Sequence, residues 1–187
     1  MTTTRRAALR RWVPFALILA LLAGCGTADE QKPVEPEPVA PTTLILVRHA
    51  EKGPEEPDPD LTDQGRERAE LLAAMLGEVE LSAVYSTKWK RNQQTARPTA
   101  ERHGLAVTEY SADQQASAFL SELLAKHSGG AVLVIGHSNT IPELLAALTG
   151  EPESDHLDSY DDLFVVTFAE LGRATVLPFK YPRVTSR

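Results

Sequence analysis

Two histidines that each follow an apolar run are the residues of this sequence best placed to do chemistry. Residues 44–47, Leu-Ile-Leu-Val, lead into Arg48 and His49, and residues 132–135, Val-Leu-Val-Ile, lead through a glycine into His137. An apolar run of this length that ends in polar residues is typical of a buried strand in a parallel sheet. Ligands of open α/β sheets bind at the carboxyl ends of the strands. We therefore expect both histidines to lie in one crevice.

A third apolar run, residues 83–86, is followed by Arg91 in the first turn of a predicted helix. Guanidinium groups bind phosphoryl oxygens through two parallel hydrogen bonds and stay charged at any physiological pH. One histidine could attack phosphorus while the other donates hydrogen bonds to its oxygens. Two histidines could instead be zinc ligands, but no further His or Cys cluster completes a zinc shell. These residues predict a site for a phosphoryl group, in a scheme that requires no metal.

Alternating strand and helix patterns predict the elements that position these residues. Strands are expected over residues 43–47, 83–86, 105–110, 131–135, 163–168 and 175–179, and helices from about 62, over 90–102, over 114–126 and over 139–150. Pro98 is expected to kink or subdivide the second helix. The alternation predicts an α/β fold, a three-layer α/β/α sandwich around a mostly parallel sheet. The last two strands are expected to form an antiparallel hairpin at one edge.

Four short motifs occur in order along this part of the chain: Arg48-His49-Ala50, Leu61-Thr62-Asp63-Gln64-Gly65, the stretch from Tyr85 through Arg91 to Ala96, and Gly136-His137-Ser138. Together they resemble the histidine phosphatase superfamily, also called phosphoglycerate mutase-like. The resemblance extends from Thr43 to about Val176 and implies a phosphoglycerate mutase-like fold.

The resemblance also implies roles for individual residues. His49 would be the nucleophile that becomes phosphohistidine, and the phosphoryl oxygens would be held by Arg48, Arg91 and His137. No cofactor is implied. The acid of the family, which protonates the leaving oxygen, usually follows the third strand, where Asp113 is the first candidate and Glu109 the second. Some members, including bacterial phosphohistidine phosphatases, lack this acid, so the donor stays open.

The N-terminal residues predict export and lipid attachment. Four arginines precede an apolar stretch over residues 13–23, and Leu22-Ala23-Gly24-Cys25 resembles the bacterial lipobox. The stretch is too short to span a membrane comfortably. We expect a signal peptide over residues 1–24, with an uncleaved anchor helix as the alternative. A lipidated Cys25 would then begin a Pro- and Glu-rich linker over 25–42, ahead of a domain over 43–187.

Charge limits the partners of this chain. It carries 19 basic and 26 acidic side chains, and without the four arginines of residues 1–24 the balance is 15 to 26, a net charge of −11. Such a surface argues against nucleic acid as a partner and against electrostatic binding to anionic lipid. Membrane association is therefore expected through the lipid on Cys25, the only cysteine.

These observations lead us to expect a lipid-anchored phosphatase of the cell envelope that hydrolyses a phosphomonoester or a phosphoramidate. The substrate would be a phosphorylated small molecule, a phosphoprotein or an envelope glycolipid. The third strand and third helix are separated by only a few residues, which predicts an open pocket and favours hydrolysis over transfer. The alternatives are a phosphomutase and a non-catalytic envelope module that binds phosphate or a partner.

Overall fold

The computed structural model describes residues 40–152 and 157–181. The predicted signal peptide, Cys25 and nearly all of the predicted linker lie outside these residues. No helix in the described part has the length and apolar character needed to cross a membrane. The elements follow one another as β1 (Thr42–Arg48), α1 (Asp63–Met75), β2 (Leu81–Ser86), α2 (Lys90–Arg102), β3 (Val107–Glu109), α3 (Ala116–His127), β4 (Ala131–Gly136), α4 (Thr140–Thr149), β5 (Asp162–Phe168) and β6 (Ala174–Lys180).

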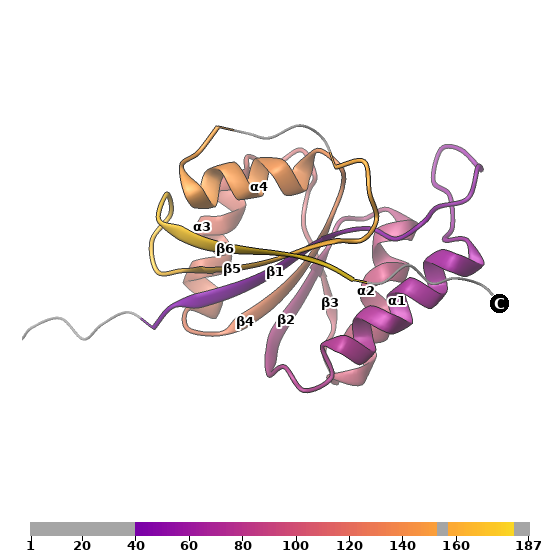
Figure 1. Ribbon diagram of the computed structural model, residues 1–187, viewed down its shortest axis with the longest axis horizontal. Helices are drawn as coiled ribbons and strands as arrows, with labels where there is room; N and C mark the ends of the chain where they lie inside the picture. Colours follow the sequence, from indigo (N-terminus) through magenta and orange to yellow (C-terminus); the bar gives the residue numbers. More distant parts are fainter. Residues whose placement is uncertain (1–39, 153–156, 182–187) are drawn as a thin grey trace, which may run out of the picture. The chain divides into compact units, whose positions relative to one another are not determined.

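The six strands form one mixed sheet in the order β3-β2-β4-β1-β5-β6 (Figure 1). The first four strands of that order are parallel, whereas β5 and β6 run antiparallel at one edge. The predicted fold class and edge hairpin are confirmed. The strands that precede the two histidines, β1 and β4, are direct neighbours, with Arg48 paired to Gly136.

Helices cover both faces of the sheet, as the three-layer prediction required (Figure 1). On one face, Leu72 of α1 and Ala96 of α2 pack on Ile45 and Ile135. On the other face, Leu120 of α3 and Leu148 of α4 pack in a second core cluster. Because β1 and β4 are buried on both faces, they hold their carboxyl ends rigidly.

The helix boundaries follow local signals in the sequence. Thr62 caps α1, since its hydroxyl accepts a hydrogen bond from the Gly65 N–H at 3.0 Å. The helix α4 ends at Gly150, which takes the left-handed conformation with φ of 74°. The expected subdivision at Pro98 does not occur, because α2 is one helix over Lys90–Arg102. Its buried face provides the packing that outweighs the hydrogen bond lost at proline.

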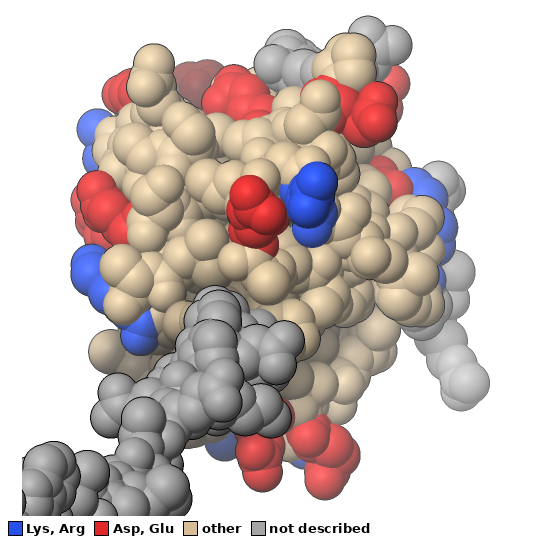
Figure 2. Space-filling view, turned by 90° about the vertical axis from the view of Figure 1, so that its left-hand side faces the viewer, with Lys and Arg blue, Asp and Glu red and all other residues tan. Residues whose placement is uncertain are grey.

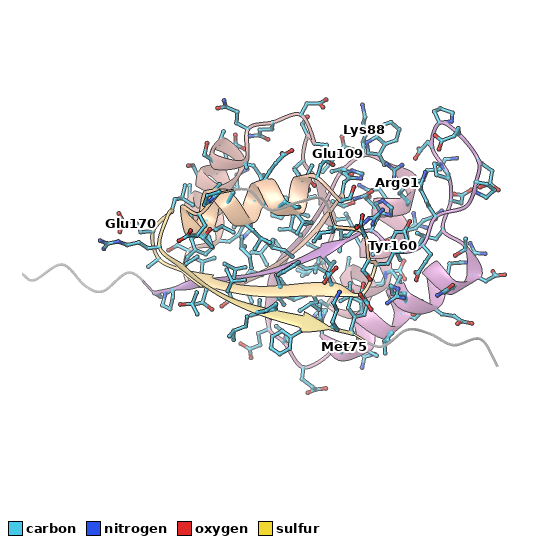
Figure 3. The ribbon with its side chains drawn as sticks, turned by 45° about the horizontal axis from the view of Figure 1, so that its top comes forward. Met75, Lys88, Arg91, Glu109, Tyr160 and Glu170 are labelled. Carbon is cyan, nitrogen blue, oxygen red and sulfur yellow. The ribbon has the colours of Figure 1, made fainter. Side chains whose placement is uncertain are left out.

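The end of the sheet that carries the β5–β6 turn lies opposite the end that carries Arg91. Figure 2 faces the end with the β5–β6 turn, where uncharged residues cover most of the visible surface. Arg91 and Glu170 mark opposite ends of the molecule (Figure 3). The arginines that the sequence singled out therefore lie at the carboxyl ends of the parallel strands, away from the face in Figure 2.

Candidate active site

His49 occupies the carboxyl end of β1 with only 4% of its surface exposed. Its backbone N–H donates to the Gly136 carbonyl at 3.0 Å, which continues the pairing of β1 with β4. The ring nitrogen Nδ1 lies 2.8 Å from the Ala50 carbonyl. Since a carbonyl only accepts, Nδ1 carries the hydrogen and Nε2 keeps its lone pair. The backbone thus holds the imidazole in the form that a nucleophile needs.

The electrostatic setting keeps His49 neutral. Burial is the largest effect, and the charge of Arg91 acts in the same direction; together with smaller contributions they lower the pKa of His49 to about 3. The hydrogen bond to the Ala50 carbonyl opposes this and offsets only part of it. At neutral pH the Nε2 lone pair is therefore available.

His137 follows β4 and faces His49, with ring centroids 5.5 Å apart in an edge-on arrangement. Its Nε2 lies 3.0 Å from the Thr87 hydroxyl, and Nη2 of Arg91 lies 3.5 Å from its Nδ1. A guanidinium can only donate, so Nδ1 accepts and Nε2 donates to Thr87. Burial, followed by the charges of Arg91 and Arg48, lowers the pKa of His137 to about 4.

Arg48 reaches the site from the last position of β1. Its Nη1 donates to the Leu157 carbonyl at 2.7 Å, and its Cζ lies 4.3 Å from the centre of the Tyr160 ring. Its Nε is buried and finds no hydrogen-bond partner among the described residues. An unpaired buried donor of this kind is costly unless a ligand or water meets it.

Arg91 reaches the site from the first turn of α2. Its Nη1 lies 3.8 Å from Asp58, and its Cζ lies 5.0 Å from the Trp89 ring centre. Within the described part of the chain, its buried Nε also lacks a partner. The ion pair and the ring hold the guanidinium in place while leaving hydrogen-bonding capacity for an anion.

These side chains surround a pocket of about 340 Å³. Its lining consists of Arg48, His49, Lys52, Trp89, Arg91, Ala112, His137, Ser138 and Asn139. All three charged residues of this set are cations, and the set contains no carboxylate. The N-terminus of α4, which follows Asn139, adds a partial positive charge. The pocket therefore suits a phosphoryl dianion.

Neither acid candidate belongs to this lining. Asp113 is exposed, and its backbone N–H meets the Ser111 hydroxyl at 3.3 Å; only its neighbour Ala112 lines the pocket. Glu109 is also exposed, at the end of β3 (Figure 3). The segment after β3 does line the pocket through Ala112, but the neighbouring Asp113 is exposed. The structure thus unites both histidines and both arginines but leaves the two carboxylates outside the pocket lining.

Two further residues contribute to the site that sequence reasoning did not identify. Tyr160 places its ring 5.8 Å from the His49 ring and shares this end of the molecule with Arg91 (Figure 3). It comes from a connecting segment, for which periodicity gives no signal. Thr87, in contrast, directly follows β2, so the rule that strand ends form the site could have found it.

A buried ion pair supports the segment after His49. Arg68 of α1, 2% exposed, places its Nε 2.9 Å from both carboxylate oxygens of Glu51. Its guanidinium also lies 5.2 Å from the Tyr181 ring centre. Gly65 packs so closely that a Cβ there would lie 2.2 Å from the Glu51 carbonyl oxygen. The start of α1 is thereby fixed against the residues that follow His49.

The described residues contain no group of three or more His, Cys, Asp or Glu that could hold a metal ion.

Comparisons with known proteins agree with this geometry. The family model of the histidine phosphatase superfamily (branch 1) matches residues 44–112. Phosphoserine phosphatase 1 from Hydrogenobacter thermophilus is 42% identical over 71 residues, which cover 34% of this chain and 34% of that protein. This chain thus aligns with about a third of that relative.

Solved structures share the fold. The protein histidine phosphatase SixA complexed with tungstate superimposes with a TM-score of 0.60 at 24% identity, over 74% of this chain and 96% of SixA. A mycobacterial glucosyl-3-phosphoglycerate phosphatase gives a TM-score of 0.60 at 18% identity, over 73% of this chain and 97% of that one. At these identities the likeness establishes the fold.

Proposed function

Because the chain belongs to the histidine phosphatase superfamily, we propose that it hydrolyses a phosphomonoester or a phosphoramidate through a phosphohistidine on His49. One observation gives this proposal its strongest support. His49 is neutral, keeps the lone pair of Nε2, and stands among Arg48, Arg91 and His137 in a pocket whose described lining holds no carboxylate.

In the first step, Nε2 of His49 attacks phosphorus in line with the leaving group. The N–P bond forms while the bond to the leaving oxygen or nitrogen breaks, and the leaving group takes its proton from water. Arg48 and Arg91 neutralise the charge on the non-bridging oxygens, where fixed cations contribute most. In the second step, water attacks the phosphohistidine, the N–P bond breaks, and orthophosphate leaves with His49 neutral again.

His137 changes its role when an anion arrives. In the free protein its pKa is lowered by burial and by the two nearby arginines. A phosphoryl dianion between those arginines offsets their charge and raises the pKa of His137, because a nearby opposite charge favours the protonated form. The imidazolium then donates from Nδ1 to a phosphoryl oxygen, while Nε2 keeps its bond to Thr87.

Among the residues that the structure describes, none of those lining the pocket is a carboxylate, and we infer a preference among substrates from this. Without a positioned acid, substrates whose leaving group departs readily react fastest, such as phosphoramidates and aryl phosphates. The Hydrogenobacter relative is named a phosphoserine phosphatase and SixA a protein histidine phosphatase. We place the substrate of this chain among phosphorylated small molecules, phosphoproteins and envelope glycolipids.

We also propose that the protein acts at the cell envelope, held by a lipid on Cys25. The support is the order of basic residues, apolar stretch and Leu22-Ala23-Gly24-Cys25 in the sequence. Mass spectrometry of the membrane-bound protein should show that residues 1–24 are removed and that Cys25 carries acyl chains. A chain that keeps residues 1–24 with an unmodified Cys25 would favour the uncleaved anchor helix.

The activity can be tested on the detergent-solubilised full chain with an aryl phosphate, in the presence and absence of EDTA. We expect phosphate release that resists EDTA, is lost in His49→Gln, and is kept in His103→Gln, a control at the C-terminal end of α2. Quenching of the reaction in alkaline detergent should trap an alkali-stable, acid-labile phosphoprotein in the wild type and in His103→Gln but not in His49→Gln.

Three outcomes would contradict the proposal. Activity that EDTA abolishes would favour metal-dependent chemistry. Equilibration of a phosphate ester without net phosphate release would indicate a phosphomutase. Tight binding of orthophosphate without turnover of any phosphorylated compound would indicate a binding module.

A further inference from the structure

The hydroxyl of Thr95 connects the two elements that carry His49 and Arg91. Thr95 lies on α2, one turn after Arg91, and is completely buried. Its Oγ1 lies 2.7 Å from the Arg91 carbonyl oxygen and 3.0 Å from the Ala50 backbone nitrogen. A carbonyl accepts and an N–H donates, so this hydroxyl donates to Arg91 and accepts from Ala50.

Ala50 is the residue whose carbonyl selects the tautomer of His49. It is fully buried, so its N–H has no access to bulk water. Its N–H is held by Thr95 at 3.0 Å, while its C=O holds Nδ1 of His49 at 2.8 Å. The two groups lie on either side of the Ala50 Cα, so the hydrogen bond from Thr95 restricts how the Ala50 backbone can turn and helps keep its carbonyl directed at Nδ1.

We propose that Thr95 is a positioning residue, which orients the Ala50 backbone so that Nδ1 of His49 stays protonated and Nε2 stays free. This inference rests on the proposed function for its kinetic consequence. Its structural consequence, the tautomer of His49, does not depend on any activity.

A purely structural role has to be weighed against this. Threonine in a helix often donates to the carbonyl four residues earlier, as Thr95 does to Arg91. That bond alone would say nothing about catalysis. The second bond is the informative one, because it joins α2 to the segment that carries the nucleophile, 45 residues away in the chain.

The same helix supplies a matched control. Thr99 lies one turn further along α2 and is also completely buried, but its hydroxyl has no hydrogen-bond partner among the described residues. Thr95→Val and Thr99→Val are therefore the same isosteric change at two equally buried sites of one helix. Thr95→Ser retains the hydroxyl and serves as the conservative variant.

The experiment compares these three variants with the wild type as full-length protein in detergent. For Thr95→Val we expect kcat for an aryl phosphate to fall by roughly 10- to 100-fold with KM within about 2-fold, the pattern of a misoriented nucleophile. Thr95→Ser and Thr99→Val should each stay within about 3-fold of the wild-type kcat. If Thr95→Val does not fold, Thr95→Ala carries the same expectation, because it removes the hydroxyl without adding a methyl group.

Nitrogen-15 NMR of the histidine rings reports the tautomer of His49. This tautomer should not change if Thr95 only stabilises the fold. In the wild type, His49 should show a protonated Nδ1 and an unprotonated Nε2 at neutral pH. In Thr95→Val these two signals should shift toward the average of a tautomer mixture, while Thr99→Val keeps the wild-type pattern. An unchanged His49 pattern in Thr95→Val, or an equal loss of kcat in both valine variants, would overturn the proposal.

The two readouts separate this inference from the proposed function. A wild type without activity, whose His49 signals still respond to Thr95→Val, would contradict the phosphatase proposal and keep the role of Thr95. An active wild type whose His49 signals do not change in Thr95→Val would contradict the role of Thr95 and keep the phosphatase proposal.

Discussion

Lowering the pH should destabilise this protein through the two site histidines. Both are held neutral in the folded state, with pKa values of about 3 for His49 and about 4 for His137, against 6.5 for an unperturbed histidine. Below pH 6.5 the unfolded chain therefore binds protons that the folded chain does not. Because the unfolded state binds more protons, the free energy of unfolding rises with pH in this range. The stability is complete above about pH 6.5 and is lost as the pH falls toward 4 and then 3.

The size of the effect follows from these values. Between pH 8 and pH 5 each histidine should remove about 2 kcal/mol from the free energy of unfolding, or about 4 kcal/mol together. Single domains are stable by only about 5–15 kcal/mol, so this loss is a large share of the total.

The assay is urea denaturation of the full chain in detergent at several pH values between 5 and 8. His49→Gln and His137→Gln should each lower the difference in unfolding free energy between pH 8 and pH 5 by about 2 kcal/mol relative to wild type. Thr99→Val changes a buried side chain without removing a titrating group, so its pH dependence should match the wild type. If both glutamine variants keep the full pH dependence of the wild type, the two histidines are not held neutral by the fold and the reasoning fails.

Two further predictions concern the residues that support the segment after His49, and both are measured by urea denaturation. Glu51→Ala removes the carboxylate that pairs with the buried Arg68 and should lower the free energy of unfolding by about 3–5 kcal/mol. As a control, Lys52→Ala removes an ion pair with the exposed Glu56 and should lower it by less than about 1 kcal/mol. Equal losses in the two variants would contradict the role of burial. Gly65→Ala should destabilise by about 1–3 kcal/mol because the new methyl group meets the Glu51 carbonyl. A stabilised Gly65→Ala variant, the usual result for alanine in a helix, would refute that packing argument.

The sequence predicted best those features that depend on neighbouring residues. Apolar runs that end in His49 and His137 located the strand ends, and Thr62 located the start of α1, because both signals are local. The acid candidates show where such reasoning ends. Asp113 follows the third strand in the chain, and its neighbour Ala112 lines the pocket while Asp113 itself is exposed; the path of this connecting segment, which tertiary packing sets, decides which of its residues face the pocket.

Tyr160 and Pro98 also show the difference between local sequence signals and contacts between distant residues. Tyr160 reaches His49 from a connecting segment whose path is set by tertiary packing, so no periodicity in the sequence reveals it. Pro98 is a local helix-breaking signal, but the buried face of α2 outweighs it. In both cases contacts between residues far apart in the chain decide the outcome.

The reversed direction of β5 has a consequence for how such an enzyme could diversify. Because β5 runs antiparallel to β1, the residues just before it arrive at the end of the sheet where the histidines lie. Leu157 and Tyr160 use this position to contact Arg48. Substitutions or insertions in this segment would change the contacts that hold Arg48 without disturbing the four parallel strands that carry His49 and His137. If the proposed function holds, substrate preference would change here while those strands stay as they are.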